Sequence, residues 1–287
     1  MGLIDLHVHS DASDGSFPPA QVVALAKEAG LKAMALTDHD TTAGIPEALK
    51  AGEESGIEVI PGIEVSSHYE GHEIHILGLF VDPSDQGLAD FLQEMRSRRG
   101  CRNEEMLHRL ATDGISFTAC ELYGNNPDTV ITRAHIARAM VQKGICSSVE
   151  QAFKKYLNPD RPYYRSRELI TPEEVLTVLL GAGGFPVLAH PLLYKLGWAE
   201  TEALIAMLTD HGLRGLECFH SSNNQDESGK LRKLAKKYAL VPTGGSDFHG
   251  AAKPDIEIGS GRGGLRVSAL YLDDIKLAMF LGGTMHA

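Results

Sequence analysis

The sequence contains little cysteine, few aromatic residues and no long apolar run. Its four cysteines form no C-x-x-C pair, and scattered thiols without a secretory signal predict a reducing, cytoplasmic location. The chain starts with a strand-like segment at residues 3–6 instead of a basic and then an apolar region, so we expect no signal peptide. No stretch of about 18 apolar residues occurs, so we expect no contact with a membrane.

Positive charge is also scarce, because 27 lysines and arginines face 38 acidic residues and leave a formal net charge of −11. Proteins that bind duplex nucleic acid by neutralising its phosphates are normally basic, so we expect no duplex partner. A small anionic substrate is not excluded, because bound metals reverse the sign of the charge locally. None of these features indicates an oligomeric state.

Short apolar runs alternate with helical patterns in the first and last thirds of the chain. Strands are predicted over residues 3–9, 33–37, 57–65, 73–81, 186–189, 213–219 and 240–246. Helices are predicted between most of them, and the first is opened by Pro18 and Pro19 and closed by Gly30. This alternation implies βαβ units and a parallel sheet. About seven strands predict a closed or nearly closed β/α barrel.

The middle of the chain has a different pattern. Helical stretches follow one another over residues 88–113, 133–143 and 148–156, with weak strand signals between them. A hydrophobic content of 43% over 287 residues suits one barrel-sized domain, or one domain with an insertion. We therefore predict a barrel formed by residues 1–98 and 167–287, interrupted by a helical insertion at residues 99–166.

Histidine and carboxylate side chains gather at the ends of the predicted strands. The group comprises His7, His9, His39, Glu64, His75, His190, Asp247 and His249. Two pairs, His7 with His9 and Asp247 with His249, are spaced i, i+2, so the two side chains of a strand pair point to the same side, roughly 6–7 Å apart. Barrel enzymes place their active sites at the carboxyl ends of the strands, so these side chains are expected to converge on one rim.

A lone histidine in a strand is more often structural than a metal ligand. Six further histidines therefore remain unassigned: His68, His72, His108, His211, His220 and His286. Several imidazoles and carboxylates at several strand ends are harder to explain structurally, because buried polar groups without partners cost several kcal/mol each, on the order of 2–7. A cluster of metal ions compensates all of them, so we predict a polynuclear metal site.

The motifs around these residues resemble one known family. They are His7-Val8-His9-Ser10, Asp14-Gly15, Thr37-Asp38-His39-Asp40, Pro61-Gly62-Ile63-Glu64, His75, Ala189-His190-Pro191 and Gly245-Ser246-Asp247-Phe248-His249. In this order they resemble the PHP (polymerase and histidinol phosphatase) phosphoesterases, and within them the nucleoside 3′,5′-bisphosphate phosphatases, also described as short-RNA 5′-to-3′ exonucleases. The likeness covers essentially the whole chain. It implies a distorted (β/α)7 TIM-like barrel and a preference for manganese.

The resemblance also implies a ligand set for two or three divalent cations. The three sets are His7, His9, Glu64 and Asp247 for the first cation, Glu64, His75 and His190 for the second, and Asp14, His39 and His249 for the third. Many relatives have histidine where this chain has Asp14, and a carboxylate suits Mn²⁺ or Mg²⁺ better than Zn²⁺. Mn²⁺ is thus the expected metal, with Mg²⁺, Zn²⁺ or Fe²⁺ as alternatives.

The predicted chemistry is attack of a metal-activated water on phosphorus, in which Glu64, Asp247 and His249 are the catalytic residues. Either His249 or a second water protonates the leaving group, and the sequence leaves this choice open. Asp38 and Asp40 are candidate partners for the ligand imidazoles, with solvated turn residues as the alternative interpretation.

Basic residues in the insertion are candidates for substrate binding. Arg133 and His135 stand at the start of a predicted helix, where anions bind well. Two further basic groups lie at Arg96, Arg98, Arg99 and Arg102 with Asn103, and at Arg161, Arg165 and Arg167. The residues favoured for gripping a second phosphate are Arg102, Asn103, Arg133 and His135, with His249 also facing the substrate. In contrast, the cationic run at 230–237 is interpreted as a solvated helix face.

We therefore predict a metal-dependent phosphoesterase that removes the 3′-phosphate of nucleoside 3′,5′-bisphosphates and gives a 5′-mononucleotide and phosphate. The same site is expected to remove 5′-nucleotides stepwise from a short oligoribonucleotide. One alternative is a small-metabolite phosphatase such as a histidinol phosphatase, with the same fold and metals. Another is a non-catalytic, metal-stabilised domain.

Overall fold

The computed structural model describes residues 2–124, 126, 128–165 and 170–284, so Arg167 and His286 lie outside the described residues. Seven strands form one sheet in sequence order. They are β1 (Ile4–Val8), β2 (Ala33–Leu36), β3 (Glu58–Tyr69), β4 (His72–Leu79), β5 (Phe185–Leu188), β6 (Gly215–His220) and β7 (Val241–Gly245). The predicted strands are all present, with ends shifted by at most four residues.

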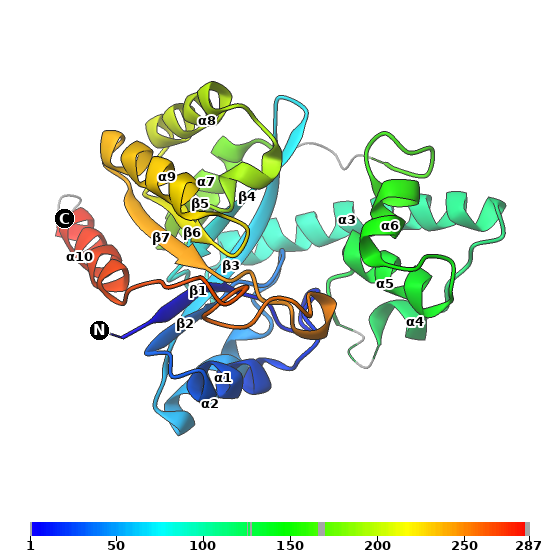
Figure 1. The fold of residues 1–287 in the computed structure, drawn as a ribbon, viewed down its shortest axis with the longest axis horizontal. Coiled ribbons are helices and arrows are strands. Elements are labelled where there is room, and N and C mark those ends of the chain that lie inside the picture. The colour runs from blue at the N-terminus through cyan, green and yellow to red at the C-terminus, as the bar shows by residue number, and fades with distance from the viewer. Residues whose placement is uncertain (1, 125, 127, 166–169, 285–287) are drawn as a thin grey trace.

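Helices surround the sheet and extend beyond it on one side (Figure 1). They are α1 (Pro19–Glu28), α2 (Ile45–Ser55), α3 (Gln86–Thr112), α4 (Ala119–Tyr123), α5 (Arg133–Gln142), α6 (Val149–Ala152), the π-helix η1 (Phe153–Leu157), α7 (Pro172–Gly181), η2 (Pro191–Tyr194), α8 (Trp198–Asp210), α9 (Gln225–Lys237), η3 (Gly250–Ala252) and α10 (Leu270–Thr284). Within the described residues, none of these helices combines the length and apolarity needed to cross a bilayer.

The sheet is mixed instead of parallel, which corrects one prediction. Strand β4 runs antiparallel to both β3 and β5, whereas the other neighbouring pairs are parallel. The reason is local, because Glu70 and Gly71 both have positive φ and join β3 to β4 in a tight hairpin. A parallel pair needs a crossover of a dozen or more residues, and the chain provides none at this point.

The barrel closes where β7 meets β1. The backbone N–H of Asp247 donates to the carbonyl of His7 at 2.9 Å, and the N–H of His9 donates to the carbonyl of Phe248 at the same distance. Gly245 permits this approach, because a Cβ atom at that position would lie 2.4 Å from the Cβ of His7. The predicted nearly closed seven-stranded barrel is therefore confirmed, and its closure brings the two i, i+2 pairs side by side.

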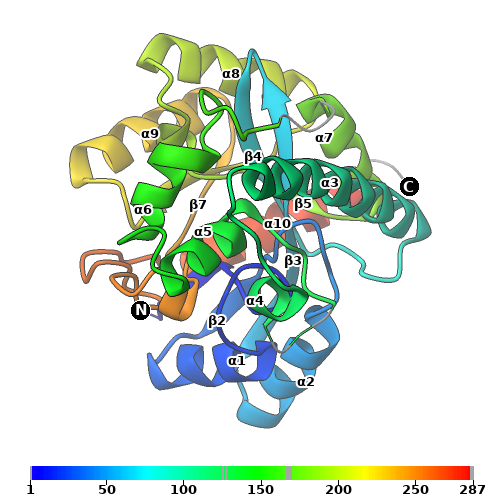
Figure 2. The ribbon, with the colours of Figure 1, turned by 90° about the vertical axis from the view of Figure 1, so that its right-hand side faces the viewer.

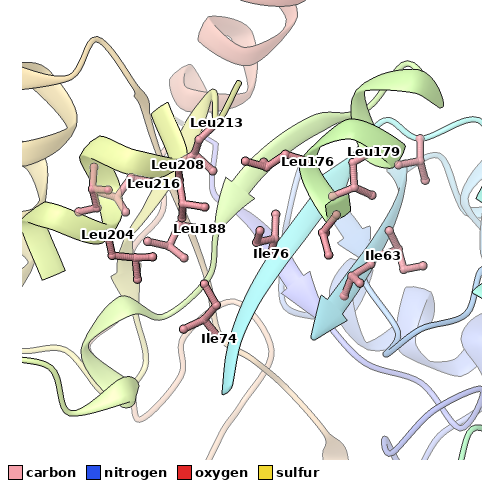
Figure 3. Close-up of a cluster of buried hydrophobic side chains, with 14 of the residues drawn as sticks. Ile63, Ile74, Ile76, Leu176, Leu179, Leu188, Leu204, Leu208, Leu213 and Leu216 are labelled. Atoms are coloured by element: carbon pink, nitrogen blue, oxygen red, sulfur yellow. The ribbon is translucent and has the colours of Figure 1, made fainter. Parts of the chain in front are cut away.

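Apolar side chains lock the strands to the outer helices. Figure 3 shows Ile63 and Ile76 of the sheet close to Leu176 and Leu179 of α7, all of them fully buried. A second cluster, which includes Phe185 of β5, packs the other face of the same strands against α10. Removing one such side chain costs about 2–5 kcal/mol, so the strand ends are held in fixed positions.

Helix α3 connects the barrel to the insertion. Its first half buries Leu88, Leu92 and Met95 in the barrel cluster, and its second half buries Met106 and Leu110 in a separate cluster with α5 and α6. The predicted boundary at residue 99 falls between these halves, and the division into domains stays a prediction. Strands β1 and β7 point toward α4–α6 in Figure 1, so the insertion lies over the carboxyl ends of the strands.

Candidate metal centre

All nine candidate ligands lie in one continuous cluster at the rim where the insertion meets the barrel. The described residues form four groups of potential ligands, and within each group the ligand atoms lie within 4.8 Å of one another. The groups are His9, Asp14, His39 and His249; His7, Glu64 and His190; His7, His9 and Asp247; and His39, Glu64 and His75. The groups share members, so the cluster is polynuclear in its geometry.

The strand-end pairs are positioned by the barrel itself. His7 and His9 point to the same side of β1, both are fully buried, and their ring centroids lie 5.2 Å apart. Past the ends of β5 and β7 the backbone takes unusual conformations, with φ of 24° at His190 and 57° at Asp247. Non-glycine residues pay a conformational cost at positive φ, and such residues cluster at functional sites.

Glu64 stands at the centre of the cluster, and its two oxygens face different imidazoles. Oε2 lies 3.3 Å from His7 Nε2 and 3.3 Å from His9 Nε2. Oε1 lies 2.8 Å from His75 Nδ1 and 3.0 Å from His190 Nε2. One oxygen toward each set of imidazoles is the arrangement that a carboxylate bridging two cations requires.

Asp14 organises the third group and connects it to the insertion. Its Oδ1 lies 3.1 Å from His249 Nε2, and its Oδ2 lies 3.8 Å from His39 Nε2. The hydroxyl of Thr132, at the N-terminus of α5, donates to Asp14 Oδ2 at 3.0 Å. The start of α5 is therefore fixed against this edge of the cluster.

The carboxylates of the cluster keep their negative charge despite burial. Burial by itself raises the pKa of Glu64, but His39 and His75 outweigh it and hold the pKa well below its ordinary value. Burial likewise raises the pKa of Asp14, and His39 again reverses the direction. For His9, burial lowers the pKa, but neighbouring carboxylates including Glu64 raise it to about 9. Buried anions of this kind create a site that attracts cations.

Unpaired nitrogens and oxygens provide a test of whether the cluster fits metal ions. Among the buried atoms of the described residues that have no hydrogen-bond partner, half belong to the candidate ligands: His7 Nε2, His9 Nδ1, His9 Nε2, Asp14 Oδ1, His39 Nδ1 and His190 Nδ1. Buried polar atoms are nearly always satisfied in folded proteins. Imidazole nitrogens and carboxylate oxygens are the donors that divalent metals take, so the residues fit such ions.

Sequence reasoning did not find the carboxylate that supports the imidazoles. Glu217 Oε1 lies 3.1 Å from His7 Nδ1, and Oε2 accepts the backbone N–H of His190 at 2.6 Å. A carboxylate on the far nitrogen of a ligand imidazole fixes its orientation and tautomer. Of the two candidates for this role from the sequence, Asp38 accepts the hydroxyl of Ser10 and Asp40 pairs with Arg99.

Two cationic or basic groups at Asp247 were also not predicted. His220 Nε2 lies 3.6 Å from Asp247 Oδ2, and Lys253 Nζ lies 2.5 Å from the same oxygen. His220 is the last residue of β6 and one of the histidines to which the sequence assigns no role, although its position matches that of other histidines at strand ends. Glu217, a buried glutamate inside the apolar run of the same strand, is the comparable signal.

The favoured residues of the insertion lie close to the cluster but have partners of their own. Arg133 pairs with Glu73 at 2.8 Å, and its guanidinium lies over the ring of Tyr164. The ring of His135 accepts the backbone N–H of Thr132 at 3.1 Å, and burial lowers the pKa of His135 to about 4. These two residues therefore border the Asp14 and His75 edges of the cluster.

Arg102 and Asn103 are buried on α3, with only 5% and 6% of their surface exposed. The amide of Asn103 donates to the carbonyl of Ile131 at 2.8 Å, just ahead of α5. Of the remaining basic groups, Arg161 pairs with Asp160 and Arg165 with Glu105 on the surface. The structure thus places α3 and α5 together but distributes the arginines over several contacts.

Known proteins resemble the chain over nearly its full length. Residues 5–176 match the PHP domain. The chain is 36% identical to a 3′,5′-nucleoside bisphosphate phosphatase from Chromobacterium violaceum, with 90% of this chain and 91% of the relative aligned. It is 37% identical to a 5′-3′ exoribonuclease from Haemophilus influenzae, over 85% and 89% of the two chains. A solved structure from Bifidobacterium adolescentis, described as a metal-dependent phosphoesterase, superposes with a TM-score of 0.84 at 32% identity, over 95% and 94%.

Proposed function

The chain belongs to the PHP domain family of phosphoesterases, and we propose that it hydrolyses the 3′-phosphate of nucleoside 3′,5′-bisphosphates to a 5′-mononucleotide and phosphate. The observation that carries this proposal is the convergence of nine histidine and carboxylate side chains on one rim, with buried ligand atoms left unpaired. The activity of the Chromobacterium relative supports the choice of substrate. A cytoplasmic location and the absence of a duplex partner remain predictions.

The proposed ligands are the nine residues of the cluster. Two or three cations would be held, with His7, His9, Glu64 and Asp247 around the first, Glu64, His75 and His190 around the second, and Asp14, His39 and His249 around the third. Divalent cations supply Lewis acidity toward the phosphate oxygens and a water that loses its proton near neutral pH. We propose Mn²⁺ as the metal, since Asp14 adds a hard oxygen ligand.

The protein side chains keep this site in one geometry. Glu217 orients the ring of His7, while His220 and Lys253 hold the carboxylate of Asp247. Glu64 and Asp247 are the proposed catalytic carboxylates, because both belong to the ligand groups and face the interior of the rim. His249 belongs to the edge nearest the insertion, and we propose that it also contacts the substrate.

The substrate's second phosphate is proposed to bind at the insertion. Arg133 and His135 border the cluster, and Arg102 and Asn103 support them from α3. The guanidinium of Arg133 is paired with Glu73 in this structure, so phosphate binding would exchange one anion for another. Two phosphate sites at a fixed separation favour a bisphosphate over a monophosphate.

A phosphate-release assay with the manganese-loaded protein tests the proposal. Adenosine 3′,5′-bisphosphate should be hydrolysed with a kcat/KM at least tenfold above that for histidinol phosphate, which represents the small-metabolite alternative. Preference for histidinol phosphate would replace the proposed substrate class. No hydrolysis of either compound, with bound manganese verified by metal analysis, would favour the non-catalytic alternative.

A further inference from the structure

A second cavity opens beside the metal centre, on the barrel and not on the insertion. It has a volume of about 660 Å³ and lies between the start of α9 and the segment that follows η3. In Figure 2 that orange segment and the yellow α9 lie to the left of α5. We call it the β6–α9 pocket, and its walls include His220, Asn223, Ser228, Arg232, Arg262 and Arg266.

The β6–α9 pocket shares a wall with the metal centre. His220 lines the pocket, and its Nε2 lies 3.6 Å from Asp247 Oδ2. The same ring lies 5.6 Å from the ring of His190, centroid to centroid. The buried side chain of His220 is therefore the wall between the pocket and the cluster, so the two sites lie one side chain apart. The proposed phosphate-binding residues of the insertion border different edges of the cluster, near Asp14 and His75.

The charge of the pocket contrasts with that of the protein. Among the described residues, three arginines and no aspartate or glutamate line it, although the chain carries a net charge of −11. Arg262 donates to the backbone carbonyl of Ser221 at 3.1 Å and pairs with Asp255. Arg232 lies over the ring of Phe219. These contacts hold two guanidinium groups at the pocket wall, where they suit an anion of the phosphate type.

The proposed reaction determines which part of a substrate would extend into such a pocket. In a bisphosphate, water adds to the terminal phosphorus, the P–O3′ bond breaks, and the 3′-oxygen leaves with a proton. In RNA the same P–O3′ bond breaks, but the phosphorus also carries the 5′-oxygen of the next nucleotide. The departing 5′-nucleotide lies toward the insertion in both cases. Only RNA has a further nucleotide attached to the scissile phosphate through its 5′-oxygen, and that nucleotide must extend from the metal centre at another edge.

We propose that the β6–α9 pocket binds the nucleotide on the 3′ side of the scissile phosphate in a short RNA, with Arg232 and Arg262 contacting its phosphate. This inference rests on the proposed function, because it assumes that the scissile phosphate sits at the metal centre. The proposal assigns these two arginines to the binding of RNA, whereas a mononucleotide substrate would not contact them. Arg232 belongs to the cationic run that looked like a solvated helix face, and it is exposed, but it also lines the pocket.

The test compares two substrates on one double variant. Arg232→Ala with Arg262→Ala should lower kcat/KM for a short 5′-phosphorylated oligoribonucleotide about tenfold or more, and mostly through KM. Hydrolysis of adenosine 3′,5′-bisphosphate should stay within about twofold of the wild type. The matched control is Lys233→Ala with Lys236→Ala, which removes the same charge from exposed positions of α9 outside the pocket and should change neither activity.

Each other outcome has a definite meaning. Equal losses on both substrates, unchanged RNA turnover, or the same loss in the control would overturn the assignment of the pocket. Hydrolysis of the bisphosphate without any RNA turnover by the wild type would overturn it too, while the proposed function would survive. Failure of the wild type on both substrates would refute the proposed function itself. Thermal unfolding of each variant verifies that the fold is intact.

Discussion

The metal centre and the insertion meet at one rim but are built in different ways. The side chains of the metal centre lie on strands or in the segments that follow them, most of them are buried, and Glu217 orients the ring of one of them, His7. Those of the insertion project from helices, and the most exposed of them, Arg133, contacts both Glu73 and an aromatic ring. The barrel thus fixes the reacting groups rigidly, whereas the insertion offers contacts that a substrate can replace.

This difference predicts a division between the two regions in the kinetic quantities that substitutions change. Changes in the metal centre should act on turnover and on metal affinity, because the ligands have no replacement in the rigid barrel. Changes in the insertion should act mainly on KM, because each arginine provides one of several contacts to the substrate. Substitutions in the two regions test that division, and their expected effects decrease from Glu64 to His135.

The largest effect is expected for Glu64→Gln. The substitution keeps the shape of the side chain but removes the charge that faces five imidazoles. Turnover of adenosine 3′,5′-bisphosphate should fall on the order of 10³-fold or more, beyond the roughly 10–100-fold loss typical of residues that act through a ligand. Steady-state kinetics in metal-defined buffer measures this, and activity near that of the wild type would break the proposed mechanism.

Glu217→Gln should have an intermediate effect. Its side chain contacts the His7 ring and the backbone of His190 instead of a cation. Metal affinity should fall by about 10–100-fold, and turnover at saturating Mn²⁺ should largely recover. A Mn²⁺ titration of activity separates the two variants, because Glu64→Gln should not be rescued. A turnover loss in Glu217→Gln that excess metal does not reverse would place this residue among the catalytic groups.

Arg133→Ala should affect substrate binding with little change in kcat. A hydrogen bond to a charged group contributes about 1.5–3 kcal/mol, so KM for the bisphosphate should rise by about 10–100-fold. Arg98→Ala is a suitable control, since Arg98 pairs with Glu94 on the exposed side of α3, and its effect should be within about twofold. A kcat defect at constant KM would contradict the division between barrel and insertion.

The smallest effect concerns stability and the protonation of His135. Burial lowers its pKa in the folded protein from 6.5 to about 4. The unfolded chain therefore binds the proton first, and the stability from the neutral ring is complete above pH 6.5 and decreases as the pH falls toward 4. Between pH 7 and pH 5 the metal-free wild type should lose about 1–2 kcal/mol more than His135→Gln. Urea unfolding at both pH values measures the difference, and equal losses would contradict it.

The sequence predicted the clustering of the candidate ligands better than their surroundings, for a topological reason. In a barrel the carboxyl ends of the strands meet on one rim, so His7, His39 and His190 converge although they are far apart in the chain. Such a rule does not exist for the insertion, where contacts such as Arg99 with Asp40 depend on how α3 docks. The antiparallel course of β4 depended on one hairpin turn within an otherwise regular βα pattern.

The residues that sequence reasoning missed differ in whether the sequence carried a signal for them. Glu217 is a charge inside an apolar strand, and His220 ends the same strand, so both carried a signal. Lys253 carried none, because it reaches Asp247 through the irregular segment after β7. Residues on regular strands can be assigned from position alone, whereas those in irregular segments require the folded chain.

Anomalous diffraction from crystals of the manganese-loaded protein tests the central claim most directly. The account predicts two or three manganese peaks within the rim, with Glu64 between two of them and Asp14 beside the third when it is occupied. Peaks at other sites, or none at these nine residues with manganese bound in solution, would contradict it.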